Sequence, residues 1–283
     1  MADYVPTVRM RRIARTLLKW RESRDLNGAD VAKQAGWSGS KQSRLENATQ
    51  PIQPADVVTL ALIYGIPADE RDAVFNSCLG AQKQGWWDAV TKDALMEDVV
   101  SYVELEAEAT TVHTFKIDLI DGLLQTKDYA AAIGDAYLPR ASAEIKRERV
   151  KARTLRQDRL TGENPIQVEA VLTEGALRTR VGGPEVMRQQ LERLVELSKL
   201  PNVDLRVIPA AGAYPAMGTP FCILSFASGY PDVGYVELLD KGVYLEEPED
   251  VEPYRDNFAG LQEVAWSARK SRTLIADIAH DLR

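Results

Sequence analysis

Histidine and cysteine are scarce in this sequence of 283 residues, which holds two of each. Cys78 and Cys222 are too few and too far apart for a disulfide framework or a cysteine-ligated metal cluster. His113 and His280 leave histidine-based catalysis with few candidates. Nucleophile-elbow, Walker-type and metal-ligand motifs are also absent from the sequence. The sequence therefore predicts no catalytic residues, no cofactor and no metal, in a protein that is not an enzyme.

Long apolar runs are missing as well. No run approaches the roughly 18 residues of a membrane span, and the mean hydropathy is -0.26. The first residues, 1–8, lack the basic-then-apolar pattern of a secretion signal. We therefore expect a cytoplasmic protein with no membrane association. Glycine (18) and proline (14) are near average usage, which excludes a fibrous or largely disordered chain.

The net charge is -7, which by itself argues against a nucleic-acid partner. However, the charge is unevenly distributed along the chain. Between Arg9 and Gln50 there are ten Lys and Arg residues but only four acidic residues, whereas residues 51–283 carry a net negative charge. A basic N-terminal segment can bind a polyanion locally while an acidic remainder repels indiscriminate binding. Basic helix faces that are merely solvated give the same pattern, so the charge alone does not identify DNA as the partner.

The sequence is long enough for two domains. Apolar spacing, Gly36 and the prolines of 51–54 predict five helices in the first domain. These helices span about 8–24, 27–35, 39–47, 55–64 and 68–82. The segment Gly85-Trp86-Trp87 marks the expected boundary, which makes residues 1–85 an all-α domain.

Residues 86–283 show a mixed pattern. Helices are expected at about 95–108, 127–136, 141–160, 184–200, 251–267 and 268–282, and strands at 111–117, 166–172, 203–208, 221–226 and 233–238. Strands that cluster late among flanking helices favour an α+β domain over a regular βαβ alternation. The predicted fold class is therefore α+β, with a larger mixed domain after the helical one.

Residues 28–47 have the pattern of a helix-turn-helix. Ala32 is small where two helices approach closely, and Gly36 can adopt the left-handed conformation of the turn. Small polar side chains let the following helix enter a major groove, where Lys and Arg reach guanine acceptors or phosphates. The candidate DNA-binding residues are Ser38, Gly39, Ser40, Lys41, Gln42, Ser43, Arg44, Asn47 and, on the preceding helix, Lys33.

The run L-N-G-A-D-V-A-K-Q-A-G-W-S-G-S-K-Q-S-R-L-E-N (26–47) resembles the helix-turn-helix of XRE-type regulators. Four later segments resemble a domain of unknown function that follows this motif in a large family of actinobacterial regulators. They are Y-V-E-L-E-A-E-A-T (102–110), G-L-L-Q-T-K-D-Y-A (122–130), V-G-G-P-E-V-M-R-Q-Q-L (181–191) and Y-L-E-E-P-E-D-V (244–251). The resemblance implies a transcriptional regulator of development or secondary metabolism, with a possible small companion protein encoded nearby.

Three positions depart from the family pattern. Gly28 stands where such motifs usually carry Gln, Gln42 where they carry Val or Ile, and Ala48 where they carry Gly. Because a buried polar side chain without a partner costs about 1–3 kcal/mol, Gln42 is expected to point toward DNA. Glu46 is repelled by phosphates, so we expect it to pair with Arg12 or Arg15 of the first helix.

A single recognition helix reads only about four base pairs, so specific binding requires two half-sites and a homodimer on double-stranded DNA. We expect residues 86–283 to supply the dimer contacts and to sense a partner or ligand. Two alternatives remain: an interaction module that sequesters its small companion protein, and a regulator gated by a metabolite.

Overall fold

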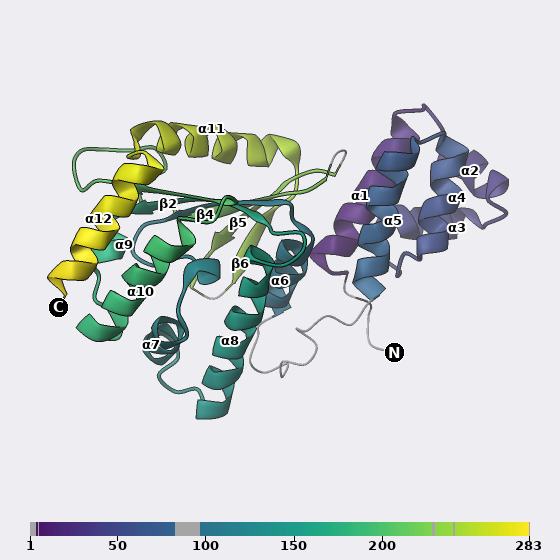
Figure 1. Cartoon of the computed structure of the whole chain (residues 1–283). Helices are drawn as coiled ribbons and strands as arrows, with labels where there is room; N and C mark the ends of the chain where they lie inside the picture. The colour runs from purple at the N-terminus through teal and green to yellow at the C-terminus, as the bar shows by residue number, and fades with distance from the viewer. Residues whose placement is uncertain (1–3, 5, 83–96, 228–229, 240, 283) are drawn as a thin grey trace. The chain divides into compact units, whose positions relative to one another are not determined.

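The computed structural model describes residues 4, 6–82, 97–227, 230–239 and 241–282. The chain divides into two compact units, which are treated separately below (Figure 1). Unit 1 comprises Met1–Gly85 together with Phe226–Pro231, and unit 2 comprises Trp86–Ser225 together with Asp232–Arg283. The boundary predicted at residues 85–87 lies outside the described residues.

Unit 1 contains the five helices that the sequence predicts. They are α1 (Val8–Glu22), α2 (Gly28–Gln34), α3 (Gly39–Glu46), α4 (Pro54–Tyr64) and α5 (Ala68–Gln82). Helix α4 begins at Pro54, because the first turn of a helix needs no backbone N–H from that residue. The all-α organisation of the N-terminal region is confirmed.

The core of unit 1 is formed by the apolar sides of these helices. Ile13 and Leu17 of α1 are completely buried and Trp20 nearly so, as their i, i+4, i+7 spacing predicts. They pack with Leu45 of α3 and Leu60 of α4. Helix α3 is therefore fixed to the rest of the unit through one side only.

Unit 2 is built on a six-stranded sheet with the order β3-β2-β1-β4-β5-β6. Its strands are β1 (Thr111–Lys116), β2 (Gln167–Thr173), β3 (Val203–Ile208), β4 (Phe221–Ser225), β5 (Val233–Glu237) and β6 (Gly242–Leu245). Strands β1, β2 and β3 are parallel, whereas β4, β5 and β6 are added antiparallel. The mixed α and β content confirms the predicted fold class, although half of the sheet is built from βαβ crossovers.

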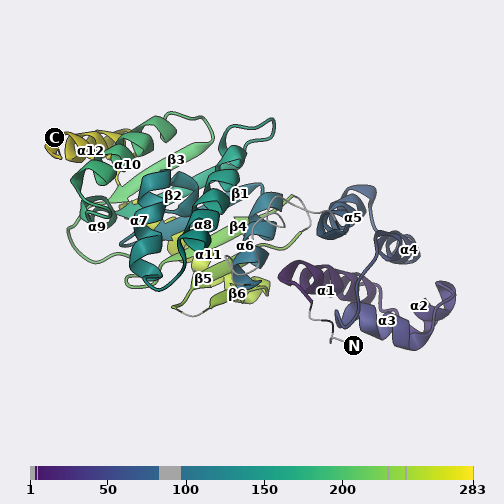
Figure 2. The same cartoon turned by 90° about the horizontal axis from the view of Figure 1, so that it is seen from below.

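Helices cover both faces of the sheet (Figures 1 and 2). They are α6 (Glu97–Glu108), α7 (Lys127–Tyr137), α8 (Ala143–Arg156), α9 (Glu174–Arg178), α10 (Pro184–Leu197), α11 (Pro248–Val264) and α12 (Ala268–Asp281). Helix α11 lies on one face, where Phe258 and Leu261 pack with Phe115 and Phe221. Helices α6, α7, α8 and α10 lie on the opposite face. The apolar side of α10, including Met187 and Leu191, is completely buried within the chain.

The sequence did not predict two elements of unit 2. Helix α9 has five residues, too few for a 3.6-residue period to show. Strand β6 is short, lies at the sheet edge and is only half-buried, so it has no clear alternation of apolar and polar residues. Within the described residues, no helix has the length and apolar character that a membrane crossing requires.

Candidate nucleic-acid interface

Helices α2 and α3 are joined by a tight turn. The Trp37 backbone N–H donates to the Ala32 carbonyl over 2.7 Å, and Gly36 takes a φ of +70°. A side chain is strained in this left-handed conformation, so the turn favours glycine. Val31 and Ala32 of α2 are buried against the unit, which sets the direction in which α3 starts.

Side chains and backbone at both ends define the limits of α3. The Ser38 hydroxyl accepts from the Lys41 backbone N–H at 3.2 Å and so caps the first turn. At the other end Ala48 adopts a φ of +50°, the conformation that glycine usually provides there. The Ala48 methyl group is buried in the core of unit 1, so the departure from Gly places an apolar group there.

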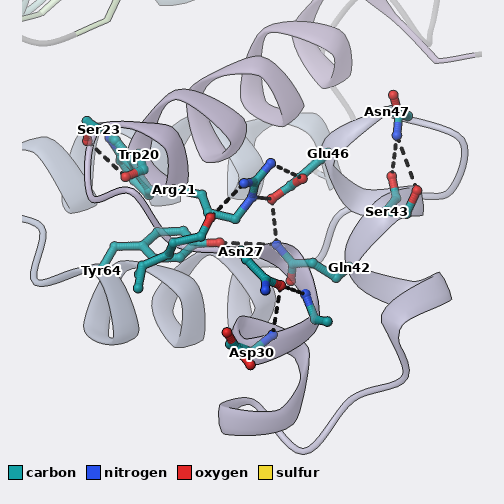
Figure 3. A network of polar contacts seen from close by, with 12 residues as sticks. Trp20, Arg21, Ser23, Asn27, Asp30, Gln42, Ser43, Glu46, Asn47 and Tyr64 are labelled. Atoms are coloured by element: carbon teal, nitrogen blue, oxygen red, sulfur yellow. Dashed lines mark hydrogen bonds and ion pairs between the residues drawn. The ribbon is translucent and has the colours of Figure 1, made fainter.

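The inner side of α3 carries a polar network (Figure 3). The Arg21 guanidinium donates to both carboxylate oxygens of Glu46, with Nε–Oε1 at 2.7 Å and Nη2–Oε2 at 3.1 Å. Gln42 donates through Nε2 to Glu46 at 2.7 Å and to the Tyr64 hydroxyl at 3.1 Å. The Glu46 hydrogen bond raises the pKa of Arg21, and burial raises the pKa of Tyr64 to about 12. Arg21 therefore stays charged and Tyr64 stays protonated at neutral pH.

This network changes two expectations. Gln42 is 1% exposed and its amide N–H groups have partners, so it lies in the core rather than pointing toward DNA. Glu46 does pair with an arginine of α1, but that residue is Arg21 and not Arg12 or Arg15. The reason is geometric: Arg21 stands at the C-terminal end of α1, where it also reaches the Leu26 carbonyl at 2.8 Å.

Lys41 is held at the side of α3. Its Nζ lies 2.7 Å from Asp56 Oδ1 and 3.8 Å from the centroid of the Trp37 ring. Asp56 also accepts from the Gln53 backbone N–H at the start of α4. The ammonium group therefore has an anion and an aromatic face as partners in the DNA-free chain.

The remaining candidates are exposed together on the outer side of α3 and at its start. They are Ser38, Gly39, Ser40, Ser43, Arg44 and Asn47, whereas Lys33 is exposed on α2. Asn47 donates to the Ser43 carbonyl at 2.7 Å, and Arg44 Nε donates to Gln50 Oε1 at 2.8 Å. These contacts are surface contacts between neighbours in sequence, which an incoming ligand can replace at little cost.

Sequence reasoning missed four residues that position this surface. Asp56 and Trp37 hold Lys41, Gln50 holds Arg44, and Tyr64 holds Gln42. Only Trp37 and Gln50 are near their partners in the sequence. The role of Asp56 could have been noticed from its position three residues after Gln53. That spacing is the pattern of a capping box at the start of a helix, here α4.

A helix-turn-helix in a five-helix unit, followed by a mixed α/β unit, is the architecture of an XRE-like regulator. Residues 12–74 match the family described as helix-turn-helix domain, which is a DNA-binding domain typical of transcriptional regulators. Residues 99–277 match the domain of unknown function DUF5753, and because this match covers more than half of the chain, the protein belongs to that family. No curated protein and no solved structure matches the chain.

Proposed function

We propose that this protein is a sequence-specific transcriptional regulator that inserts the outer side of α3 into the major groove of double-stranded DNA. The observation that carries the proposal is the division of α3 into two sides. Gln42 and Leu45 are buried, whereas Ser40, Ser43 and Arg44 are exposed. Small polar side chains allow close approach to base edges, and an arginine supplies the bidentate donor for guanine or a phosphate.

The proposed contact surface consists of Ser38, Gly39, Ser40, Ser43, Arg44 and Asn47, with Lys33 and Lys41 as phosphate contacts. Gln42 is left out, because it would have to leave Glu46 and Tyr64 to reach a base. Lys41 is retained because its side chain is still 31% exposed beside Asp56.

The regulator acts as a homodimer on two half-sites one helical turn, about 34 Å, apart. Two copies are needed because unit 1 offers one short recognition helix per chain, and we assign the contacts between the copies to unit 2. We infer from the family resemblance that the protein works in the cytoplasm, in the control of development or secondary metabolism, and that a small companion protein encoded nearby binds it.

The test is binding of the full chain to fragments of its own and neighbouring promoters, titrated against salt. Specific binding should weaken steeply with salt. The slope of log K against log salt concentration should correspond to several phosphate contacts. Arg44→Ala should weaken operator binding about 5- to 150-fold if Arg44 reads a base. If Arg44 contacts a phosphate instead, the salt slope should fall by about one while all sequences weaken alike.

Arg71→Ala is the matched control, because Arg71 lies on α5 and pairs with Asp72 on that helix. It should leave operator affinity unchanged. The assay is repeated with the neighbouring small protein added. If neither condition gives a specific complex, or if Arg44→Ala and Arg71→Ala behave alike, the proposed function is wrong.

A further inference from the structure

Helix α12 lies at the margin of unit 2, beside α10 (Figures 1 and 2). Its inner side is fixed to the unit: Ser271, Ile275 and Ile278 are buried, and the Ser271 hydroxyl accepts from the Val207 backbone N–H of β3 at 2.9 Å. Just before the helix begins, the Trp266 backbone N–H donates to the Val207 carbonyl at 2.9 Å. Because α12 is held at its start and along its inner side, its outer side is presented in one orientation.

The outer side of α12 borders an open hollow of about 490 Å³, lined by residues of the segment 266–277. Trp266 and Leu274 contribute half-buried apolar groups, whereas Lys270, Thr273 and Asp277 are exposed. The Lys270 ammonium lies 3.7 Å from the centroid of the Trp266 ring. One side of a single helix thus combines apolar groups with charges of both signs, as interfaces with an apolar centre and a polar rim do.

The charges of α12 are ordered opposite to those of its neighbours. Arg269 and Lys270 stand in its first turn, and Asp277 and Asp281 lie in its C-terminal half. The helices α7, α8, α9, α10 and α11 each carry an acidic residue in the first turn, as the positive pole of the helix dipole favours. Among the described residues, these four charged groups of α12 have no ion-pair partner. Neither the helix dipole nor a neighbouring side chain therefore explains the charge order of α12.

A second copy of the same helix does explain this order. When two copies of α12 lie antiparallel across a two-fold axis near Thr273, the basic first turn of each faces the acidic half of the other. Lys270 and Asp277 are seven residues, or about two turns, apart, so they lie on the same side of the helix. Each can then pair with the other residue type in the second copy, one pair on either side of the axis. Antiparallel packing also sets the two helix dipoles in opposite directions.

We propose that the outer side of α12 is the contact surface between two copies of this chain, with Trp266 and Leu274 covered and Lys270 facing Asp277 of the second copy. This inference rests on the proposed function, which assigns the dimer contacts to unit 2, and it names the surface. The occupant is a second copy because the charges of the helix match those of the same helix reversed. A symmetric contact requires that self-complementarity, whereas a contact with a different protein does not.

The experiment measures self-association of the full chain by sedimentation equilibrium, and the parent should be a dimer. Two double variants give the outer side of α12 a single sign of charge. Arg269→Glu with Lys270→Glu makes it acidic, and Asp277→Lys with Asp281→Lys makes it basic. Each should raise the dimer Kd about 10- to 100-fold, because like charges then face each other across the axis. Both variants place the new charges where the helix dipole favours them, so α12 itself should still fold.

Mixing the two variants is the decisive step. In the mixed dimer an acidic helix faces a basic one along its whole length, so the equimolar mixture should dimerise at least as tightly as the parent. The matched control is Arg147→Glu with Lys151→Glu, which changes the net charge as much as the acidic variant does. These two residues are exposed on α8, so the control should remain a dimer.

The proposal is overturned if the parent is a monomer, which would leave this surface to a different partner. It is also overturned if either double variant dimerises as tightly as the parent does, or if the mixture stays monomeric. These measurements involve no DNA. If the promoter assay gives specific binding while both α12 variants remain dimeric, the regulatory function stands and only the α12 contact is wrong. If the mixture restores the dimer while no promoter fragment binds, the reverse holds.

Discussion

The side chains under α3 illustrate how one ion pair can organise a surface. Glu46 is 9% exposed and accepts hydrogen bonds from both Arg21 and Gln42. Arg21 lies on α1, and Gln42 also donates to Tyr64 of α4, so these bonds to two other helices set the rotation of α3 about its axis. The direction in which Ser43 and Arg44 point therefore depends on residues that do not contact DNA in the proposed complex.

At this scale we predict that Arg21→Met destabilises unit 1 by about 2 kcal/mol, since a nearly buried carboxylate loses its counter-ion. Adding Glu46→Met should restore part of the loss, because no uncompensated charge then remains. Urea denaturation of the two single variants and the double variant gives the coupling energy. If the two substitutions prove additive, the ion pair contributes nothing to the fold.

Among the elements, the α2–α3 turn has a strict backbone requirement at one position. Gly36 has a φ of +70°, and no atom lies within 4 Å of a Cβ added there. A substitution therefore meets open space, and its cost comes from the backbone alone. Gly39, at the first position of α3, also faces open space but has no positive φ.

We predict that Gly36→Ala lowers the free energy of unfolding by about 1 kcal/mol, because alanine is strained in the left-handed region. Gly39→Ala should instead raise it by about 0.5 kcal/mol, since alanine has fewer unfolded conformations and a higher helix propensity. Both values come from urea denaturation under the same conditions. Equal effects of the two substitutions would contradict the assignment of the turn to Gly36.

Across the whole molecule, both cysteines and several tyrosines are buried. Burial raises the pKa of Cys78 to about 12 and that of Tyr129 to about 12, and it also raises the pKa of Cys222. The folded chain thus keeps protons that the unfolded chain releases above about pH 9 for thiols and pH 10 for phenols. More protons bound in the folded state mean that stability falls as pH rises.

We therefore predict that stability falls between pH 9 and 12, by at most about 1.4 kcal/mol per pH unit for each group. Cys78→Ala should reduce the fall in the free energy of unfolding of unit 1 between pH 9 and 10. In this pH range the Cys78 thiol of the unfolded chain loses its proton. Urea denaturation at a series of pH values provides the slope. Stability that stays flat to pH 11 would show that these groups are not protected by the fold.

Elements whose signal is local were predictable. The spacing of Ile13, Leu17 and Trp20 predicted helix α1. Ala32 and Gly36 predicted the turn between α2 and α3. Helix α9 and strand β6 were not predictable, because five or fewer residues carry too little pattern. The exposed side of α3 was largely foreseen, whereas Gln42 was not, since its partner Tyr64 lies 22 residues along the chain.

By itself the sequence determined that five helices come first, that a helix-turn-helix lies among them, and that small polar residues begin the third helix. These properties follow from spacing, capping and turn residues within short segments. Tertiary structure alone decided that Glu46 pairs with Arg21 and that Lys41 rests against Asp56. The physical reason is that a charged side chain chooses among partners brought close by folding, and distance in space cannot be read from order along the chain.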